Sequence, residues 1–463
     1  MQHQPCRCLI PIPIFAIFLT IGLMILLAPQ PVRAQTPLTL QQAVEIALEK
    51  NPTRKVALAN QRVAAAGIRK ARSDLWPQLT FTESFTRGND PVYVFGTKLR
   101  QRRFTLTDFE LARLNTPTPL NNFNTRLGVT WNLFDFRESW LGVARAQRLH
   151  AAADRQLERA EQELVFRVVE AYFALLLAQK NQQVAQDAVR TAQAILEYSR
   201  ARFEAGLVVQ SDVLSAQVHA ASRRQELIRA RNDVKVAAAR LNHELGVPAE
   251  SRFDPAEVLA ERDLPTTSLE EVVARALEQR PDLQGIKQRE AAQEKGVAMA
   301  KAAFGPRVDL FAGWEADNAA FLSNGGTHWL GGVEVEFDLF QGGAKRARLA
   351  RERALRDRMA ALRATATSGV QLEARSAYFD LEAARQQVEV VRAAVAQARE
   401  SLRIIQDRYQ AGLTTITDLL RAEDATNRTQ TQYWETVYRL HTSHANLELA
   451  TGTLNAGSPV VTP

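Results

Sequence analysis

The segment RFEAGLVVQSDVLSA at residues 202–216 returns 206 positions later as RYQAGLTTITDLLRA at residues 408–422. A second pair lies near the start of each half, where LQQAVEIALEKNP at residues 40–52 matches LEEVVARALEQRP at residues 269–281. Similar segments at a long, regular spacing indicate an internal repeat, in which one structural unit occurs twice. The second pair is 229 positions apart, and the difference of 23 residues predicts a longer loop between the two strands of the first copy, because loops tolerate insertions.

The two copies predict the same order of elements: a helix, a strand, a loop, a second strand, a very long helix, a turn and a shorter returning helix. The opening helix of the first copy is expected at about residues 40–73, and the strands are expected at about residues 78–86, 123–134, 307–315 and 329–340. Apolar and polar residues alternate along them, so that each strand has one apolar and one polar face. Runs of about 9–11 residues with this alternation suit tilted membrane strands with a wet lumen. A half-buried soluble sheet would show the same alternation.

The number of strands adds a constraint. Four strands cannot enclose an aqueous pore, since known single-chain barrels begin at about eight strands. An open sheet edge cannot lie in lipid, where each unpaired N–H or C=O group costs several kcal/mol. If these strands cross a membrane, several copies of the chain must therefore share one barrel.

The long helices are expected at residues 137–203 and 344–409, each with one interior glycine and no proline. At ~1.5 Å per residue, each would be about 100 Å long. Helices of this kind need neighbours to cover their apolar stripes, so a bundle or barrel of long helices is predicted. The expected boundaries are 35–246 for the first copy, 247–268 for a connecting equatorial segment, 269–452 for the second copy and 453–463 for a flexible C-terminal tail.

Residues 1–34 differ in composition from the rest of the 463-residue chain. Arg7 is the only charge before an apolar stretch over residues 9–28, and a small-residue end, Val-Arg-Ala, follows at residues 32–34. This pattern is typical of a secretory signal peptide, with cleavage expected before Gln35. The alternative is an uncleaved membrane anchor.

Export limits the functions that the chain can have. Cys6 and Cys8 both lie in the predicted signal peptide, so the mature chain would have no disulfide and no cysteine for lipid attachment. The formal net charge of +7 falls to +5 without this segment, and export argues against nucleic acid as a partner. No catalytic constellation stands out, so neither an enzyme nor a cofactor is predicted. His441 and His444 are discounted as a metal site, because no acid or cysteine accompanies them at ligand spacing.

The doubled unit resembles the TolC-like outer-membrane efflux proteins. The likeness rests on Leu-Phe at the strand exits (133–134 and 339–340) and on Arg-aromatic-x-x-Gly-Leu at the turns (202–207 and 408–413), and it covers nearly the whole mature chain. The resemblance implies an α+β membrane protein, mainly α, in which a homotrimer forms a 12-stranded β-barrel with four strands per chain. A long α-helical barrel would continue it from the outer membrane of a Gram-negative-type envelope across the periplasm.

The same resemblance implies a function and partners. The protein would be the exit duct of a tripartite efflux or type I secretion system, conducting substrates passively. It would meet a periplasmic adaptor protein, an inner-membrane pump of the RND, ABC or a similar class, and outer-membrane lipid. The alternative is an exported periplasmic coiled-coil adaptor or secretion scaffold without a pore. The nature of the cargo stays open, because fold does not determine it.

The family's functional positions can be placed on this sequence one by one. By resemblance, Gly206-Leu207 and Gly412-Leu413 are the tips that contact the adaptor. Asp418 falls where the family has an acidic ring that narrows the pore.

The remaining gate positions include two departures from the family. Tyr409 and Asp212 resemble a pair whose hydrogen bond holds the tip closed. Arg421 stands where a second ring of acids can occur, and Thr414 replaces a basic residue that helps latch the closed state. An alternative for Asp212, and for Asp418 likewise, is helix capping, because Asp is favoured at helix starts.

A dense basic cluster follows the fourth predicted strand. Its members are Lys345, Arg346, Arg348, Arg351, Arg353, Arg356 and Arg358. One interpretation is a collar against anionic lipid head groups; the other is a solvated helix surface partly compensated by Glu352 and Asp357.

Overall fold

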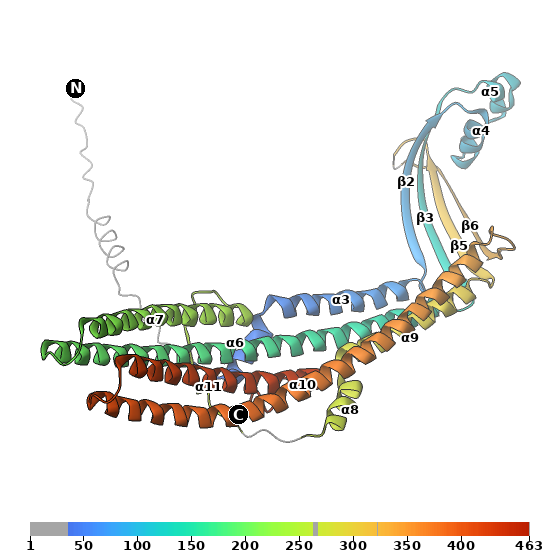
Figure 1. The fold of residues 1–463 in the computed structure, drawn as a ribbon. Helices are drawn as coiled ribbons and strands as arrows, with labels where there is room; N and C mark the ends of the chain where they lie inside the picture. The colour runs from blue at the N-terminus through green and yellow to red at the C-terminus, as the bar shows by residue number, and fades with distance from the viewer. Residues whose placement is uncertain (1–35, 263–266, 322, 463) are drawn as a thin grey trace, which may run out of the picture.

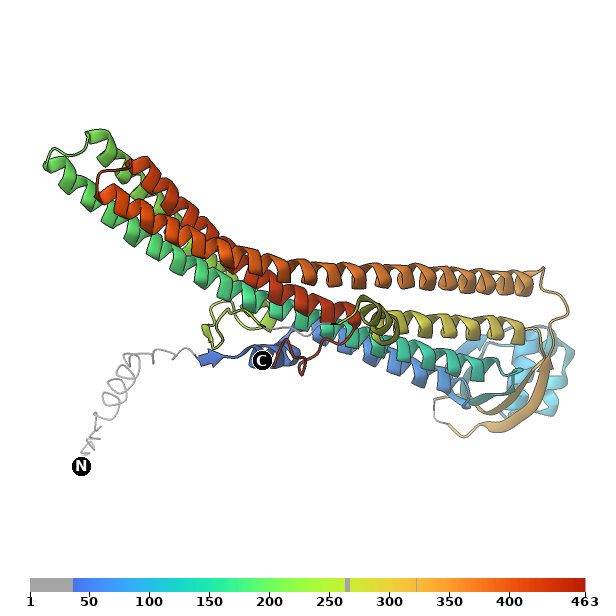
Figure 2. The ribbon, with the colours of Figure 1, turned by 60° about the horizontal axis from the view of Figure 1, so that its bottom comes forward.

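The computed structural model describes residues 36–262, 267–321 and 323–462, so the predicted signal peptide lies outside the described residues. The chain is elongated, with a bundle of long helices and a four-stranded sheet at one end of it (Figures 1 and 2). No helix in the described ranges combines the length and the apolar composition that a membrane crossing needs.

The two halves of the chain contain corresponding elements. The first half comprises α2 (Leu40–Lys50), α3 (Pro52–Ser73), β2 (Gln78–Gly88), β3 (Leu120–Phe134), α6 (Glu138–Glu204) and α7 (Gln210–Leu245). The second comprises α8 (Leu269–Gln279), α9 (Pro281–Ala302), β5 (Arg307–Asn318), β6 (Gly326–Glu336), α10 (Ala344–Gln410) and α11 (Ile416–Thr451). Corresponding helices have equal lengths of 11, 22, 67 and 36 residues.

The opening helix differs from the expectation of one continuous helix over residues 40–73. It is divided at Asn51, whose extended backbone ends α2 and whose side chain accepts a hydrogen bond from the Thr53 amide at 2.7 Å. Pro52 then begins α3, a position that suits its fixed φ and missing N–H. The Asn51 side chain also donates to the Glu244 carbonyl at 2.8 Å, which ties this break to the end of α7.

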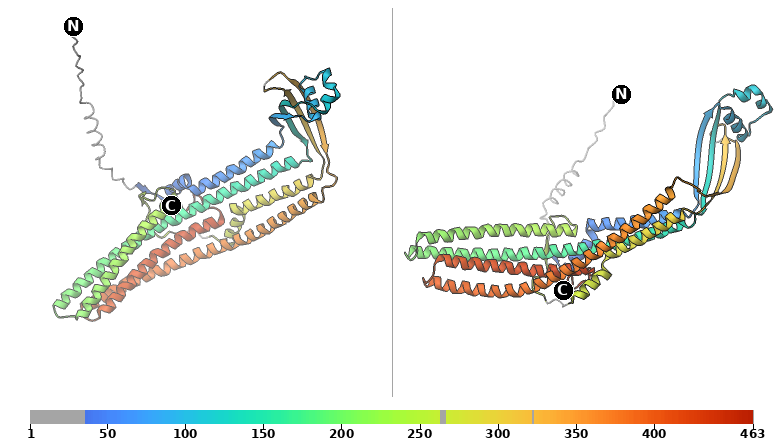
Figure 3. Two further views of the ribbon diagram at one scale, coloured as in Figure 1. Left: turned by 90° about the horizontal axis from the view of Figure 1, so that it is seen from above. Right: turned by 45° about the vertical axis from the view of Figure 1, so that its right-hand side comes forward.

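The returning helices meet the break between the two opening helices in both halves. Gly246 ends α7 with φ 69°, and a Cβ there would lie 2.8 Å from the Asn51 Cα. Gly452 ends α11 with φ 78°, and a Cβ there would lie 2.8 Å from the Arg280 Cα. Positive φ and close backbone contact both favour glycine. As a result α3 continues the line of α7 (Figure 3).

The sheet has the order β2-β3-β5-β6 and is antiparallel throughout. One row across it joins Phe81, Leu127, Trp314 and Trp329, whose exposed fractions lie between 41% and 80%. Directly paired residues share one face of a sheet, so one face is a continuous, exposed apolar surface. The fourth strand ends at Glu336 rather than at the expected residue 340.

The extra residues of the first copy form structure that the sequence did not predict. Between β2 and β3 lie α4 (Pro91–Arg100), a short 3-10 helix η1 (Leu106–Phe109) and α5 (Leu111–Asn115). They lie at the end of the sheet farthest from the bundle (Figure 1). Gln101, which is 2% exposed, donates to the Asn121 carbonyl and to Asn122 Oδ1 at 2.8 and 2.9 Å, so the insertion is attached to the polar face of β3.

The largest core lies at the middle of the molecule, around Tyr172 of α6. This side chain is fully buried, and its hydroxyl donates to the Leu38 carbonyl at 2.8 Å. Short parallel strands β1 (Thr36–Leu38) and β4 (Phe253–Pro255) pair beside it. The prediction of a flexible C-terminal tail at residues 453–463 is wrong, because apolar side chains of this segment enter the core. Those side chains are Leu454, Val460 and Val461, all at most 2% exposed.

Candidate functional site at the helix tips

The two turns that end the long helices lie together at the end of the bundle opposite the sheet (Figure 1). Gly206 and Gly412 have φ of 75° and 74°. In each turn the next leucine amide bonds back to an arginine carbonyl at 2.8 Å, Leu207 to Arg202 and Leu413 to Arg408. This is the glycine-terminated helix end in which a left-handed residue satisfies the last carbonyls.

Each turn presents an apolar side chain to solvent. Leu207 is 66% exposed and Leu413 is 69% exposed. Burying such a side chain against a partner removes apolar surface from water, which is favourable. The four turn residues that the family resemblance assigned to partner contact are therefore placed at an accessible end of the molecule.

Asp418 is held by the start of α11. Its Oδ2 accepts from the hydroxyls of Thr414 and Thr415 at 2.9 and 2.7 Å, and from the Thr415 amide at 3.3 Å. The Thr415 hydroxyl in turn accepts from the Asp418 amide, which completes a reciprocal capping box. The hydroxyls of Thr415 and Thr414 hold the pKa of Asp418 below its usual value, and the Arg421 charge acts in the same direction. Helix capping and a charged carboxylate therefore coexist at this residue.

Asp212 occupies the matching position of the first copy without that support. Val208 and Val209 stand where the second copy has its two threonines. Val209 precedes α7 and makes no side-chain cap bond. Asp212 still places a negative charge in the first turn of α7, where the helix dipole favours it.

Tyr409 is buried between the two copies, at 3% exposure. Its hydroxyl lies 3.4 Å from the Ser199 hydroxyl, and its ring packs edge-on against Tyr198 at a centroid distance of 5.9 Å. No hydrogen bond joins Asp212 to Tyr409 among the described residues, where the Tyr409 hydroxyl contacts Ser199 instead.

Arg202 makes the direct bond between the two tips. Its Nη1 donates to the Tyr409 carbonyl at 2.7 Å, and its guanidinium lies 5.7 and 5.4 Å from the ring centroids of Tyr198 and Tyr409. A cation over aromatic faces is attracted by the ring quadrupole. In the sequence, this arginine is one residue of the repeated turn motif. No local pattern predicted that it connects the two copies.

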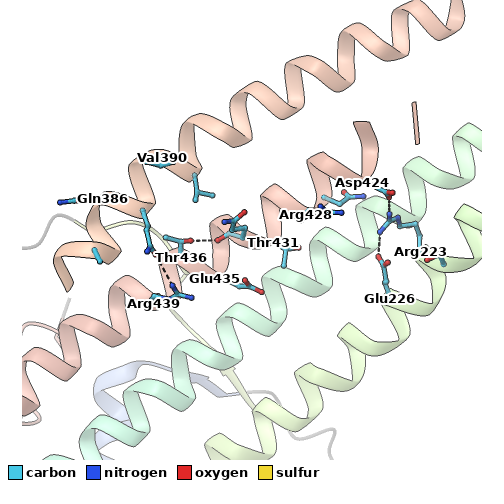
Figure 4. Close-up of a pocket in the computed structure, with 16 residues that line it drawn as sticks. Arg223, Glu226, Gln386, Val390, Asp424, Arg428, Thr431, Glu435, Thr436 and Arg439 are labelled. Atoms are coloured by element: carbon cyan, nitrogen blue, oxygen red, sulfur yellow. Dashed lines mark hydrogen bonds and ion pairs between the residues drawn. The ribbon is translucent and has the colours of Figure 1, made fainter. Parts of the chain in front are cut away.

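A buried polar cluster joins the copies farther from the tip. The Glu423 side chain, 1% exposed, meets His219 Nε2 at 2.7 Å and Arg223 Nε at 3.4 Å. Arg223 also pairs with Asp424 and with Glu226 (Figure 4). The α7 side chains of the first copy thereby bond the α11 side chains of the second.

This cluster lies at one end of a groove of about 1180 Å³ between α7, α10 and α11 (Figure 4). Amide, hydroxyl and charged side chains line most of it, among them Gln386, Thr431 and Arg439. A groove of this composition stays hydrated and offers hydrogen-bonding groups along the bundle.

The discounted histidine pair has structural contacts. His441 Nε2 lies 2.7 Å from the Ala260 carbonyl, and its ring stacks on Phe173 at 4.3 Å. His444 Nε2 lies 3.6 Å from Glu448 Oε1. Burial lowers the pKa of both rings, to about 4 for His444, which favours their neutral, packed forms.

About half of the basic cluster at the start of α10 is paired with acids. Lys345 bonds Asp338 at 3.1 Å, and Arg348 bonds Glu138 at 2.8 Å. Other members of the cluster, Arg346, Arg353 and Arg358, are exposed.

Comparison with known proteins defines first the fold and then the family. The structure of the Campylobacter jejuni CmeC outer membrane channel superimposes with a TM-score of 0.77 at 18% identity, covering 94% of this chain and 93% of that one. The sequence matches the outer membrane efflux protein model over residues 43–247 and 272–453, and the chain belongs to this family.

Sequence relatives agree with this assignment. CyaE of Bordetella pertussis is 25% identical over 85% of this chain and 80% of its own. The alkaline protease secretion protein AprF of Pseudomonas aeruginosa is 24% identical over 90% of this chain and 85% of its own. The predicted family is confirmed, and the chain is an outer-membrane efflux protein whose helical part extends into the periplasm. Members of the family are channels and not enzymes, which favours the channel over the poreless adaptor.

Proposed function

We propose that three copies of this chain form one twelve-stranded barrel and act as the exit duct of a tripartite efflux or type I secretion system. The observation that carries the proposal is the four-stranded sheet with an exposed apolar face and two open edges. Within the described chain β2 and β6 each pair on one side only. An unpaired strand edge in lipid is too costly to persist. The β6 edge of one chain would therefore pair with the β2 edge of the next chain.

Exposed apolar side chains of α10, one of which (Val390) also borders the groove between α7, α10 and α11, support assembly in the periplasmic part as well. Leu372, Phe379 and Val390 are 70%, 56% and 69% exposed. Their separations of 7 and 18 residues are close to two and five helical turns, so they form one stripe along α10. A neighbouring copy packed on this stripe would cover it and complete a helical barrel.

The tips supply the gate and the partner contact of the proposed duct. In a three-fold assembly Asp418 would place three carboxylates around the axis, with Arg421 beside them. Within each chain, the bond from Arg202 to the Tyr409 carbonyl would hold the two tips together in the closed state. Leu207 and Leu413 would contact a periplasmic adaptor that leads to an inner-membrane pump, and the basic cluster at the start of α10 would contact lipid head groups.

The proposal is tested with the mature chain extracted in detergent. We expect light scattering to give three times the mass of one chain, and the same sample to form ion-conducting channels in planar bilayers. A monomer that never conducts would contradict the proposal.

The gate is tested by Arg202→Ala, which should raise single-channel conductance or open probability. The matched control is Arg408→Ala, at the corresponding position of the second copy, where the side chain is exposed. For the acidic ring, Asp418→Asn should weaken block by multivalent cations, while Asp212→Asn should change it less. Equal effects of Arg202→Ala and Arg408→Ala would remove Arg202 from the gate.

A further inference from the structure

A cluster of potential metal ligands lies on the polar face of the sheet. Glu315 and Asp317 belong to β5, and His328 belongs to β6. Glu315 pairs directly with His328 across the two strands, and Asp317 follows two positions later, on the same face. Side chains in this arrangement are close neighbours, so the strand register alone brings two carboxylates and an imidazole together.

The distances between the side chains are short enough for a shared ligand. His328 Nε2 lies 3.3 Å from Glu315 Oε2, and His328 Nδ1 lies 3.8 Å from Asp317 Oδ2. One ligand atom from each of the three residues lies within 4.8 Å of the others.

The unusual member is Asp317, which is 0% exposed. Its Oδ1 accepts hydrogen bonds from the side-chain amides of Asn122 and Asn124, at 2.5 and 3.1 Å. Its Oδ2 is buried and has no hydrogen-bond partner in the described part of the chain. A buried carboxylate oxygen without a partner is costly, and this oxygen is directed at His328. That arrangement indicates a ligand between them.

The inserted segment of the first copy explains why Asp317 is buried. Gln101 bonds Asn122, which bonds Asp317 in turn. On the other side, the turn into β6 packs so closely that a Cβ at Gly326 would lie 1.8 Å from the Arg100 carbonyl oxygen. The insertion and the turn together exclude solvent from Asp317, while the side chain of His328 remains 38% exposed.

The charges in direct contact with the cluster come from Arg126 and the two acids, and Arg102 lies farther out, where its Nη2 donates to the Thr327 carbonyl at 3.4 Å. Arg126, the neighbour of Glu315 in the same cross-strand row, bonds Glu315 Oε1 at 2.7 Å and balances one carboxylate. Besides His328, Glu315 Oε2 has a long contact of 3.4 Å with the Asn124 amide in the described part of the chain. With a neutral imidazole, the four side chains carry one net negative charge, and two carboxylate oxygens point toward the ring.

We propose that Glu315, Asp317 and His328 bind a divalent transition-metal ion of the zinc type. One imidazole nitrogen and two carboxylate oxygens are ligands that such ions accept at about 2.0–2.2 Å. Around an ion with such bond lengths the ligand atoms lie roughly 3.5 Å apart, so ligand atoms that lie within 4.8 Å of one another must draw together on binding. Water would fill the remaining coordination positions.

The second histidine-acid cluster of the chain provides a contrast. His219, Glu423 and Asp424 are equally close, but the Arg223 guanidinium contacts both carboxylates. That cation already occupies the space between the acids, so the cluster serves as an ion-pair network.

Metal binding would connect β5 to β6 beside the insertion and satisfy the buried Asp317 oxygen. The site needs only one chain and does not depend on the proposed duct. If the strands form the proposed barrel, each copy would place one such ion on the luminal side of its outer end.

The test is calorimetric titration of metal-free, untagged mature protein in detergent with Zn²⁺. We expect one more site per chain in the wild type than in His328→Gln. Asp317→Asn should weaken that site at least tenfold, and His219→Gln should retain it. Co²⁺ as a second probe should give visible absorption bands that are lost in His328→Gln.

Circular dichroism establishes that each variant is folded. Because His328 is partly exposed, His328→Gln decides the outcome even if Asp317→Asn fails to fold. Equal stoichiometry and affinity in wild type and His328→Gln would overturn the proposal, as would absence of binding in the wild type. A chain that binds zinc but forms no channels would contradict the duct and leave the site standing.

Discussion

The two halves of the chain have helices of equal length, yet matching residues meet different surroundings. Tyr172 of α6 is fully buried, whereas its counterpart Tyr378 of α10 is only partly buried. The neighbouring phenylalanines differ more, with Phe173 at 7% exposure and Phe379 at 56%. The helix α6 contacts α2, α3, α7, α9 and α11, while α10 contacts α8, α9 and α11. A helix in the middle of the bundle and one at its edge can therefore share a sequence pattern and still differ in burial.

The tips differ in a second way. The second copy holds Asp418 with two threonine hydroxyls, and the first copy offers valines at the same positions. At the tips, one of the hydrogen bonds between the copies runs from Arg202 of the first to the carbonyl of Tyr409 in the second. The two copies therefore differ in function at the tips although their helices have equal lengths. The first copy supplies the Arg202 side chain that connects the tips, and the second supplies the Asp418 carboxylate that two threonines hold.

The largest effect is expected where the central and edge helices differ most. Tyr172→Ala removes a fully buried ring and its bond to Leu38, and should cost roughly 3–5 kcal/mol of stability. Tyr378→Ala should cost roughly 1–2 kcal/mol, because a partly buried ring loses less apolar contact. Thermal unfolding of the purified variants in detergent measures both. Equal losses would show that the edge helix is covered as completely as the central one.

A pH-dependent difference is expected at His444, where the first copy has Ala238. Burial, reinforced by the charges of His441, Arg262 and Arg385, holds the pKa of His444 at about 4, below its usual 6.5. The unfolded chain therefore binds more protons between these values, and stability falls as the pH drops from 6.5 toward 4, by at most about 3 kcal/mol.

The measurement for His444 is the unfolding temperature against pH for the wild type and for His444→Ala. The variant should lose the decline that the histidine causes. Burial raises the pKa of Glu448, so this residue makes stability rise as the pH drops, opposite to His444. Comparing the wild type with His444→Ala separates the two contributions. Parallel curves for the two proteins would exclude His444 as the source.

A symmetric effect is expected where the two copies agree. Gly246→Ala and Gly452→Ala should each cost about 2 kcal/mol, because both combine a positive φ with a backbone contact of 2.8 Å. The control is Gly206→Ala, which has φ 75° but nothing within 4 Å, and should cost about 1 kcal/mol. Denaturation followed by circular dichroism distinguishes these values, and a large asymmetry between Gly246 and Gly452 would contradict the equivalence of the two helix ends.

The smallest effect is expected at the tips. Thr415→Val gives the second copy the residue of the first and should cost about 1 kcal/mol, because a side-chain cap is lost. The reciprocal Val209→Thr should stabilise by a similar or smaller amount. Hydrogen exchange of the first turns of α7 and α11 would detect both changes locally. Faster exchange in α11 without the expected slowing in α7 would show that Asp212 cannot form the box.

Several features followed from the sequence because they are local. The lengths of the long helices, the alternation of the strands and the two glycine turns depend on periodicity and on residues within a few positions of one another. The repeat was visible because the same local patterns occur twice in the chain. The family resemblance rested on the same local motifs. The break at Asn51-Pro52 was also readable in principle, since proline at a first helical position is a known start signal.

Other features depend on residues far apart in the chain, and only the tertiary structure decided them. Arg202 reaches Tyr409 across 207 positions, and Asn122 reaches Asp317 across 195. The tail enters a core whose apolar lining comes from both halves, so its composition did not reveal its packing. Periodicity states which face of an element is apolar, but contact between faces depends on how the elements are arranged, and that arrangement is set by the burial of the whole chain.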